Sequence, residues 1–245
     1  GRSERAAAYI PFPQAVPYVY TIDSEHCIKC GECVDKCPTN AIDLSDSGST
    51  QSLEVGSIIF ATGYQQYPAS NLVEYGYGNY PDVVTMLEME RLTSLFGPTQ
   101  GRVTRFSNGE EAKKIAIILC AGSRDKNRYI PHCSRICCMY SIKQAIMLRE
   151  MLGKEVWVYY TDIRATGRGY EELYWRAQEA GVIFIRGKAS EVWRNSKNGK
   201  LVVRAEDTLT GSIMEEDFDT VALAVAMIPS KDLEDLAQKL HLPLG

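Results

Sequence analysis

Eight cysteines of this 245-residue chain fall into two groups with short spacings. The first group follows the pattern C-x2-C-x2-C-x3-C-P and comprises Cys27, Cys30, Cys33 and Cys37. The second group comprises Cys120, Cys133, Cys137 and Cys138. Thiolates are strong ligands for zinc and for iron–sulfur clusters, so the grouping predicts metal ligation rather than a disulfide framework.

The first group has the spacing typical of cysteines that hold an iron–sulfur cluster. Two-residue spacers let three successive sulfur atoms converge, and Gly31 leaves room for the backbone beside the cluster. The three-residue spacer directs Cys37 elsewhere, and in modules with two clusters such a cysteine ligates the second one. Cys37 therefore either closes a cluster of this chain or serves one whose other ligands lie outside it. A zinc site is the alternative, because zinc modules also use C-x2-C pairs.

The second group surrounds the junction between a predicted strand and a predicted helix. Cys120 ends the strand, and twelve residues separate it from Cys133, enough to fold a loop over a bound object. Cys133 and Cys137 are four positions apart and are expected to share a helix face. The helix N-terminus, Arg124 and Arg135 would stabilise thiolates and an anionic cluster. We interpret this group as a second metal centre, with core packing or a redox dithiol as alternatives.

The elements that must position these groups alternate between strand and helix in the second half of the chain, which predicts βαβ units and a parallel sheet. Strands are predicted at 18–23, 41–44, 55–62, 113–120, 156–160, 182–185, 201–204, 212–217 and 220–226. Helices are predicted at 85–95, 134–152, 170–180 and 232–240, with a helical turn at 34–37. The apolar run 55–62 is expected to be a strand buried on both faces. Residues 64–82 are predicted to be a loop.

Several classes of protein are not expected. The net charge of −4 provides no basic field for nucleic acid. No run of about 18 apolar residues indicates a membrane span, and residues 1–8 lack the apolar stretch of a secretory signal. Clustered thiols without such a signal favour a reducing compartment, with the cytoplasm as the default. The turn at 119–125 keeps only Gly122 of the G-x-G-x-x-G fingerprint, so a dinucleotide is not expected to bind there in the usual way.

Together, these stretches resemble the A subunit of heterodisulfide reductase, an iron–sulfur flavoprotein of methanogens with relatives in other anaerobes. The resemblance covers nearly the whole chain. It is carried by both cysteine patterns and by residues 9–17, 58–63, 139–143 and 162–164. The stretches expected before and after these segments are absent, so the chain is expected to be an internal fragment of a larger protein.

The resemblance implies an α/β, thioredoxin-reductase-like FAD/NAD(P)-binding fold, present in part, with part of an inserted ferredoxin-like α+β module. Residues 1–50 would be the C-terminal half of that ferredoxin module. Residues 51–112 would be a segment of the FAD-binding domain, and 113–228 a nucleotide-binding-like domain that carries a cluster site. Residues 229–245 would return toward the FAD domain.

The resemblance also implies [4Fe–4S] clusters and FAD as cofactors, with all eight cysteines as cluster ligands and with Thr62, Gly63 and Lys143 near the flavin. A cation such as Lys143 can stabilise negative charge on a reduced flavin, although a solvated surface lysine is the simpler interpretation. The chain would be part of an oxidoreductase and would pass electrons between FAD and clusters, with flavin-based bifurcation as an extension. No catalytic residue is expected in it, and the isolated fragment need not be active.

The implied partners are other heterodisulfide-reductase-type subunits and a ferredoxin, hydrogenase or dehydrogenase electron donor, with a homodimer as one arrangement. Two other hypotheses stay open at this point. One is a pyridine-nucleotide oxidoreductase with a ferredoxin insert, and the other is a zinc-stabilised interaction module.

Overall fold

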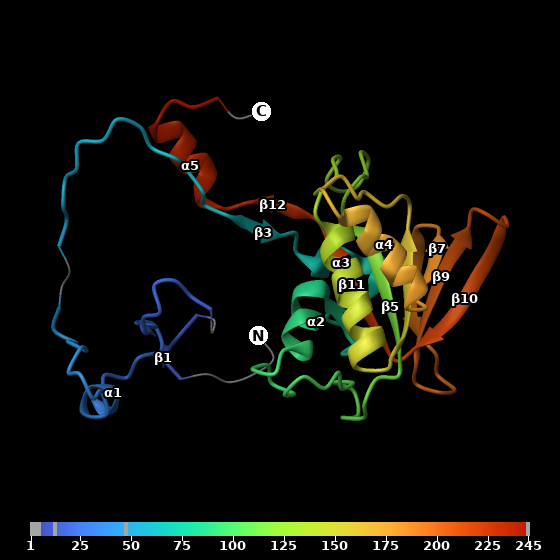
Figure 1. Ribbon diagram of the computed structural model, residues 1–245, viewed down its shortest axis with the longest axis horizontal. Coiled ribbons are helices and arrows are strands. Elements are labelled where there is room, and N and C mark those ends of the chain that lie inside the picture. The colour runs from blue at the N-terminus through green and yellow to red at the C-terminus, as the bar shows by residue number, and fades with distance from the viewer. Residues whose placement is uncertain (1–5, 12–13, 47–48, 244–245) are drawn as a thin grey trace. The chain divides into compact units, whose positions relative to one another are not determined.

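The computed structural model describes residues 6–11, 14–46 and 49–243, and it divides into two units, Gly1–Phe60 and Ala61–Gly245 (Figure 1). Parts of the predicted 1–50 module and of the 9–17 stretch therefore lie outside the described residues. The predicted domain boundaries at 50, 112 and 228 stay predictions.

The first unit contains three short elements. Strand β1 (Ala8–Tyr9) pairs antiparallel with β2 (Thr21–Ile22), and helix α1 (Glu32–Asp35) follows. Part of the strand predicted at 18–23 is thus confirmed. The strand predicted at 41–44 is wrong, because the Asp43 carboxylate accepts hydrogen bonds from the Ser45 N–H at 2.8 Å and hydroxyl at 2.6 Å and closes a turn.

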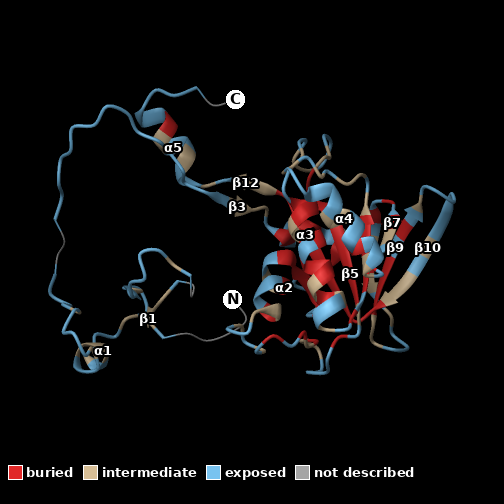
Figure 2. Cartoon of the chain, viewed as in Figure 1, coloured by how far each residue is buried: buried red, intermediate tan, exposed pale blue. Residues whose placement is uncertain are grey.

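The strand predicted at 55–62 is also wrong. These residues form no regular element, and Ile58, Ile59 and Phe60 are exposed (Figure 2). A continuous apolar run becomes a buried strand only when other strands flank it and layers cover both faces. Within the described ranges no strand pairs with this segment. The apolar residues therefore have no neighbouring strand with which to form a sheet.

The second unit is built on a five-stranded, fully parallel sheet. In spatial order its strands are β4 (Val83–Thr85), β11 (Thr220–Val225), β5 (Lys114–Ala121), β6 (Glu155–Tyr160) and β7 (Ile183–Arg186). Helix α3 (Cys137–Ile146), extended by the π-helix η3 (Met147–Met151), connects β5 to β6, and α4 (Tyr170–Glu179) connects β6 to β7. The predicted α/β class is therefore confirmed.

Two layers cover this sheet (Figures 1 and 2). One layer consists of α3, α4 and α2 (Met86–Thr93), the last begun by a capping box between Thr85 and Glu88. The other layer contains the antiparallel sheet of β8 (Ala189–Arg194), β9 (Leu201–Asp207) and β10 (Ser212–Phe218), with the short helices η1 (Ala69–Asn71) and η2 (Val73–Tyr75). Along β5, Ile115 and Ile117 face the helices, whereas Ala116 and Ile118 face the opposite layer.

A second antiparallel pair extends from the end of the parallel sheet. It joins β3 (Tyr64–Gln66) to β12 (Met227–Pro229), and α5 (Asp232–Lys239) follows in sequence. The predicted loop 64–82 thus contains β3, η1 and η2, and the sequence patterns did not reveal β4 or β8. The predicted helix at 134–152 begins later, at Cys137.

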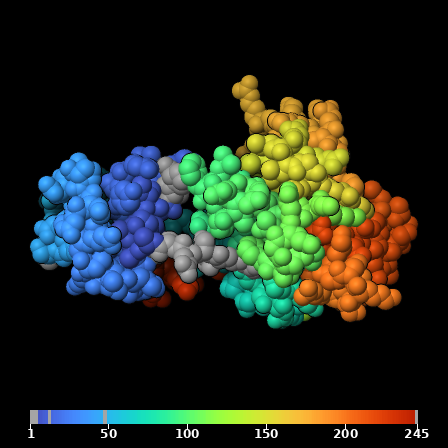
Figure 3. Space-filling view, turned by 90° about the horizontal axis from the view of Figure 1, so that it is seen from below, coloured from blue at the N-terminus to red at the C-terminus, as the bar shows by residue number. Residues whose placement is uncertain are grey.

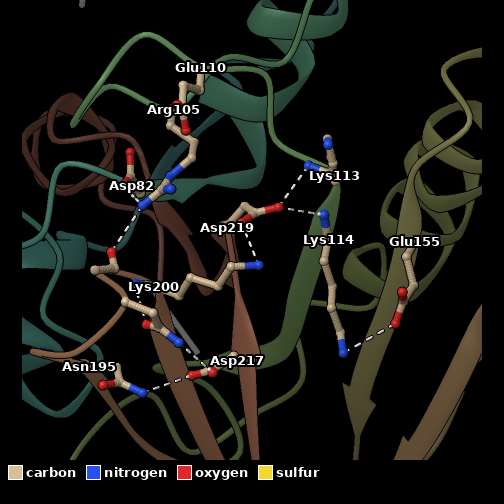
Figure 4. Close-up of polar contacts among 12 residues, drawn as sticks. Asp82, Arg105, Glu110, Lys113, Lys114, Glu155, Asn195, Lys200, Asp217 and Asp219 are labelled. Atoms are coloured by element: carbon tan, nitrogen blue, oxygen red, sulfur yellow. Dashed lines mark hydrogen bonds and ion pairs between the residues drawn. The ribbon is translucent and has the colours of Figure 1, made fainter.

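A buried carboxylate fixes the starts of two neighbouring strands of the parallel sheet. Asp219 accepts the N–H groups of Lys113 at 2.8 Å and Lys114 at 2.9 Å, and it pairs with Lys200 at 3.1 Å (Figure 4). Burial alone would raise the pKa of Asp219, but the two backbone N–H groups and Lys200 outweigh it and lower the pKa below its ordinary value. Asp219 therefore anchors the start of β5 beside the start of β11.

A second contact joins two surface loops of this unit. Arg105 pairs with buried Asp82 at 3.5 Å and donates to the Gly199 carbonyl at 2.9 Å. In Figure 3 the green surface of the first loop meets the orange surface of the second.

We expect Asp219→Asn to lower the free energy of unfolding by about 1–3 kcal/mol near pH 7, because a neutral amide replaces the charged carboxylate that accepts two buried N–H groups and pairs with Lys200. A depressed pKa adds stability above the unfolded value, about 3.9, and this stability is lost as pH falls through the lower folded value. The difference between the two proteins should therefore shrink in acid. Urea titrations from pH 3 to pH 7 measure it.

The matched control is Asp217→Asn. Asp217 accepts from the exposed side-chain amide of Asn198 at 2.8 Å, so we expect a change within about 0.5 kcal/mol. Equal losses in the two variants, or a pH-independent effect at Asp219, would contradict the anchoring role.

Candidate metal centres

The four cysteines of the first group line one cavity of about 690 Å³ in the first unit. The loop that carries them turns through left-handed backbone at Lys29 (φ 55°) and Gly31 (φ 80°), and α1 begins directly after Gly31. Apolar side chains also line the cavity, among them Ile22, Ile28 and Ile42. Cys27, Cys30 and Cys33 therefore line the same cavity, and their role as cluster ligands stays a prediction.

Cys37 lines the same cavity and has its own hydrogen-bond donors. Its sulfur lies 3.5 Å from the Thr39 hydroxyl and accepts the Ala41 N–H at 3.3 Å. The Thr39 hydroxyl, followed by backbone N–H groups, lowers the pKa of Cys37. This cysteine is thus prepared to act as a thiolate, either for this cavity or for a second cluster beside it.

The second group lies where the strand order of the parallel sheet reverses direction. The chain proceeds from β5 to β6 and β7 on one side, and returns to β11 on the other side of β5. In open α/β sheets this reversal of strand order creates a crevice beyond the carboxyl ends of the strands, where ligands bind. Cys120 lies at the carboxyl end of β5, and α3 begins at Cys137 after the connecting loop.

A bulge turns Cys120 toward the helices. Ile118 pairs with Leu223 and Ala121 with Val225, so β5 has one more residue than β11 between these pairs. The extra residue allows Cys120, at φ 57°, to pack on the helix face together with Leu119. In a regular strand Cys120 would face the opposite layer with Ala116 and Ile118. The bulge therefore places Cys120 on the same face as Cys137 and Cys138.

The N-terminus of α3 brings the other three cysteines. Ile136 is its N-cap residue and supplies no side-chain hydrogen bond, so the first N–H groups of the helix have no side-chain cap. Cys133 precedes the helix, and Arg135 between them has a φ of 67°. The expectation that Cys133 and Cys137 share a helix face is therefore wrong. Instead Cys133 accepts the Arg135 N–H at 3.3 Å from an irregular loop.

Burial dominates the acidity of the second group. It raises the pKa of Cys120 and Cys137, and it raises that of Cys138 to about 11. Negative charge on neighbouring cysteines of the group raises these pKa values further. A bound metal would have to displace these protons, as metal binding to cysteine always does.

Arg124 compensates this accumulation of negative charge. Burial raises the pKa of Cys120, and the positive charge of the Arg124 guanidinium acts against it and lowers the pKa. Asp162, which follows β6, holds the guanidinium through two hydrogen bonds of 2.5 and 3.1 Å. The Asp162 carbonyl also accepts from the Cys138 thiol at 3.9 Å. The sequence indicated Arg124 as a nearby charge, but it did not reveal the link through Asp162.

In neither cysteine group do three sulfur atoms lie within 4.8 Å of one another. Among the described residues, the one set of three or more metal-ligand side chains with ligand atoms within 4.8 Å of one another is Asp23, Glu25 and His26. Tetrahedral zinc with Zn–S bonds near 2.3 Å would require sulfur separations of about 3.8 Å. The turn at Gly122 is also filled, because a Cβ there would meet Leu72 at 3.1 Å and Tyr67 at 3.2 Å.

A cavity of about 250 Å³ adjoins α3 and is lined by Lys143. Tyr140 and Gln144 of the same helix line it, as do Tyr64 and Met227 of the β3–β12 pair. The Lys143 ammonium lies 2.9 Å from the Glu90 carboxylate at its edge.

Thr62 and Gly63 are not among the lining residues of this cavity and directly precede β3. The Thr62 hydroxyl lies 3.3 Å from that of Ser230, and Gly63 has a φ of 71° with open space around it. The structure thus brings Lys143, but not Thr62 or Gly63, to the cavity wall.

These centres define a class of protein. The family model described as "4Fe-4S binding domain" matches residues 20–43, which include all four cysteines of the first group. None of the helices in the described part of the chain has the length and apolar character needed to cross a bilayer. The chain therefore contains a segment that matches an iron–sulfur binding domain, and a separate unit built on a parallel α/β sheet.

The particular relatives are A subunits of heterodisulfide reductases. The chain is 46% identical over 238 residues to the A subunit of the H(2):CoB-CoM heterodisulfide,ferredoxin reductase of Methanothermobacter marburgensis, covering 96% of this chain and 36% of that protein. It is 45% identical to the A subunit of the ferredoxin/F(420)H(2)-dependent CoB-CoM heterodisulfide reductase of Methanosarcina acetivorans, covering 99% and 30%. The predicted resemblance to the heterodisulfide reductase A subunit is confirmed, and the chain spans about a third of the length of these relatives.

Solved structures of more distant proteins align with part of the chain. The thioredoxin reductases of T. acidophilum and Lactococcus lactis cover 71% of it, at 13% and 16% identity and TM-scores of 0.42 and 0.43. The alignments cover 45% and 46% of those two chains.

In the metal-free, reduced chain we expect Cys138 to react with iodoacetamide at least about tenfold more slowly than Cys133 at pH 8. Cys138 is buried and its raised pKa leaves little thiolate, whereas Cys133 is half-buried. Peptide mass spectrometry after timed quenching gives both rates. Equal rates, or a Cys138 rate that does not rise toward pH 10, would contradict the burial described above.

Proposed function

We propose that this chain is an electron-transfer segment of an oxidoreductase of the heterodisulfide-reductase type, passing electrons between FAD and [4Fe–4S] clusters. The observation that carries the proposal is the convergence of Cys120, Cys137 and Cys138 on one face of the sheet at the reversal of strand order. A nucleotide turn would occupy this position in an ordinary reductase. In this chain three features place cysteines at that position instead. They are the bulge in β5, the left-handed backbone of Cys120 and the N-terminus of α3.

The donor set fits an iron–sulfur cluster at both groups. Four thiolates can be supplied at each, and the buried surroundings of the second exclude water from Cys120, Cys137 and Cys138. Arg124 and the free N–H groups of α3 offset the negative charge there. When bound, such clusters carry single electrons, and their potentials are set by charge, hydrogen bonds to sulfur and exposure.

The cavity beside α3 supports a flavin neighbour. Lys143 presents a cation at its wall, and Tyr64 and Tyr140 present aromatic rings. A cation at this place would stabilise negative charge on a reduced flavin ring. Thr62 and Gly63 would approach another part of the same cofactor, since they precede the strand that carries Tyr64.

The partners follow from the names of the relatives. Those names state CoB-CoM heterodisulfide together with ferredoxin, H2 or F420H2 as reactants of the complexes. We propose that this chain serves such a complex with the other subunits and with a ferredoxin, hydrogenase or dehydrogenase donor. Homodimer formation and flavin-based bifurcation belong to the same proposal, and the heterodisulfide reaction itself would take place in a partner subunit.

The decisive experiment is anaerobic reconstitution of the chain with iron and sulfide. We expect Cys137→Ala/Cys138→Ala to lose the iron and sulfide of one cluster, because two of the four ligands of the second group are removed. Iron, sulfide and zinc per chain are measured together with the visible absorption spectrum.

Ser141→Ala is the matched control, since Ser141 lies buried on the same helix and its hydroxyl has no hydrogen-bond partner among the described residues. This variant should keep the full iron content. A cysteine double variant that keeps all its iron would remove the second centre, and zinc in place of iron would support the interaction-module hypothesis.

The flavin contact is tested with FAD and the full chain. We expect Lys143→Met to weaken binding about tenfold, since a charged hydrogen bond contributes about 1.5–3 kcal/mol, and quenching of FAD fluorescence gives the dissociation constant. Glu90→Gln should strengthen binding, because it releases Lys143 from its ion pair of 2.9 Å.

Lys113→Met is the control, because the Lys113 side chain is exposed and is not among the residues that line this cavity. If Lys143→Met and Lys113→Met bind FAD alike, Lys143 does not contact the flavin.

A further inference from the structure

Basic side chains gather at the carboxyl ends of β5, β6 and β7, which lie at one edge of the parallel sheet (Figure 1). The segments 122–136, 161–169 and 186–188 contain eight arginine or lysine residues and two aspartates, a formal charge of +6. The whole chain has a net charge of −4, so the rest of it carries −10. We call this group the basic edge, and its members are Arg124, Lys126, Arg128, Arg135, Arg164, Arg168, Arg186 and Lys188.

The two aspartates form ion pairs within the basic edge and neutralise only part of it. Asp125 lies 3.5 Å from the Lys188 ammonium. Asp162 pairs with Arg124 at 2.5 Å and with Arg164 at 3.4 Å. Five exposed cations of the edge have no carboxylate partner in the part of the chain that the structure describes, and these are Lys126, Arg128, Arg135, Arg168 and Arg186.

The loop after β5, which carries the first of these cations, is held in one shape. The Ile130 N–H donates to the Gly122 carbonyl at 3.2 Å, and the Asp125 N–H donates to the Ile130 carbonyl at 3.1 Å. The Asp125 carboxylate accepts two backbone N–H groups of the tip at 3.1 Å each. The Tyr129 hydroxyl donates to the Glu74 carboxylate at 2.8 Å and ties the loop to η2. Because the loop is already ordered, a partner that binds it loses little affinity to the ordering of backbone.

The distribution of the cations suits a protein partner better than a small anion. A small anion requires cations that converge on it, whereas an extended surface of one sign complements a protein of the opposite charge. Arg186 lines a cavity of about 330 Å³, but Lys126 and Arg128 lie exposed at the tip of a loop. Glu171 and Glu172 follow in the first turn of α4, and the edge keeps a positive excess when they are included.

The basic edge also surrounds the more accessible side of the second cysteine group. Cys120, Cys137 and Cys138 are buried, whereas Cys133 is half-buried and lies in the loop that carries Lys126. A cluster on this group would therefore have its most accessible ligand among the basic residues. A carrier that docks on the edge would approach the cluster from the side of Cys133.

We propose that the basic edge is the docking surface for an electron-carrier protein with an acidic surface, which exchanges single electrons with the cluster on the second cysteine group. In the forward direction the carrier is oxidised by one electron and the cluster is reduced by one, with no bond made or broken. This inference rests on the proposed function, because the electron exchange requires a cluster at this group.

The test measures the binding of an acidic plant-type ferredoxin to the reconstituted full chain, with basic cytochrome c as the probe of opposite charge. Lys126→Glu/Arg128→Glu/Arg168→Glu should weaken ferredoxin binding at least about tenfold at about 50 mM salt, because three unpaired cations of the edge become anions. At about 500 mM salt the difference should vanish, because exposed charges are then screened. Bio-layer interferometry gives the dissociation constants and both rates.

Arg102→Glu/Lys113→Glu/Lys197→Glu is the matched control, because it changes the net charge equally at the opposite edge of the sheet. Arg102 and Lys113 are exposed in the segment before β5, and Lys197 is exposed in the turn between β8 and β9. This turn contacts the same segment, since Arg105 donates to its Gly199 carbonyl at 2.9 Å. The control variant should bind the ferredoxin as tightly as the parent.

Equal losses in the two triple variants, or a parent that binds cytochrome c as tightly as the ferredoxin, would overturn the inference. Tighter binding of duplex DNA than of the ferredoxin at about 150 mM salt would also overturn it. The iron content of the same samples separates the two levels of the argument. A chain that holds its clusters but shows no charge effect overturns the inference alone, whereas a chain that takes up no second cluster overturns both the inference and the proposed function.

Discussion

The extra residue in β5 is the constraint on which the second centre depends. Strict alternation would direct Cys120 into the layer of β8, β9 and β10, away from the start of α3. The bulge reverses this direction and requires a positive φ at a non-glycine residue, at a cost of about 1–2 kcal/mol. Pairing with β11 before and after the bulge, at Ile118 and Ala121, holds the strained residue in place. Such local strain persists where the surrounding structure imposes it, which is a mark of functional sites.

The same junction shows how a nucleotide-type fold can serve thiol chemistry. The reversal of strand order and the helix start persist, and both favour an anion. Leu72 and Tyr67 fill the space beside Gly122, where an open turn would admit pyrophosphate. Arg124, held by Asp162, supplies positive charge on the side of Cys120. The crevice at the carboxyl end of β5 thus still favours a negatively charged group. Cysteine side chains line it where a nucleotide-binding turn would otherwise lie.

Local patterns in the sequence were sufficient for the motifs and for most of the parallel sheet. The cysteine spacings and the apolar strands at 113–120 and 220–226 depend on short stretches of chain, and the structure agrees with them. The bulge could not be predicted, because it arises from the pairing of β5 with a strand about one hundred positions away. The predicted strand at 55–62 failed for the related reason that an apolar run specifies burial only where partners exist.

Helix α3 is the element that joins the two parts of the proposed site. Cys137, Tyr140 and Lys143 follow one another at intervals of three residues along it. At 1.5 Å per residue, the first and the last are separated by about 9 Å along the helix axis. The helix therefore fixes the distance between the thiols and the Lys143 cavity, and Ser134 fixes the β3–β12 pair against the same end through Met227. Because a packed helix does not stretch, any group bound in the cavity is held at a constant separation from the cysteines, with Tyr140 between them.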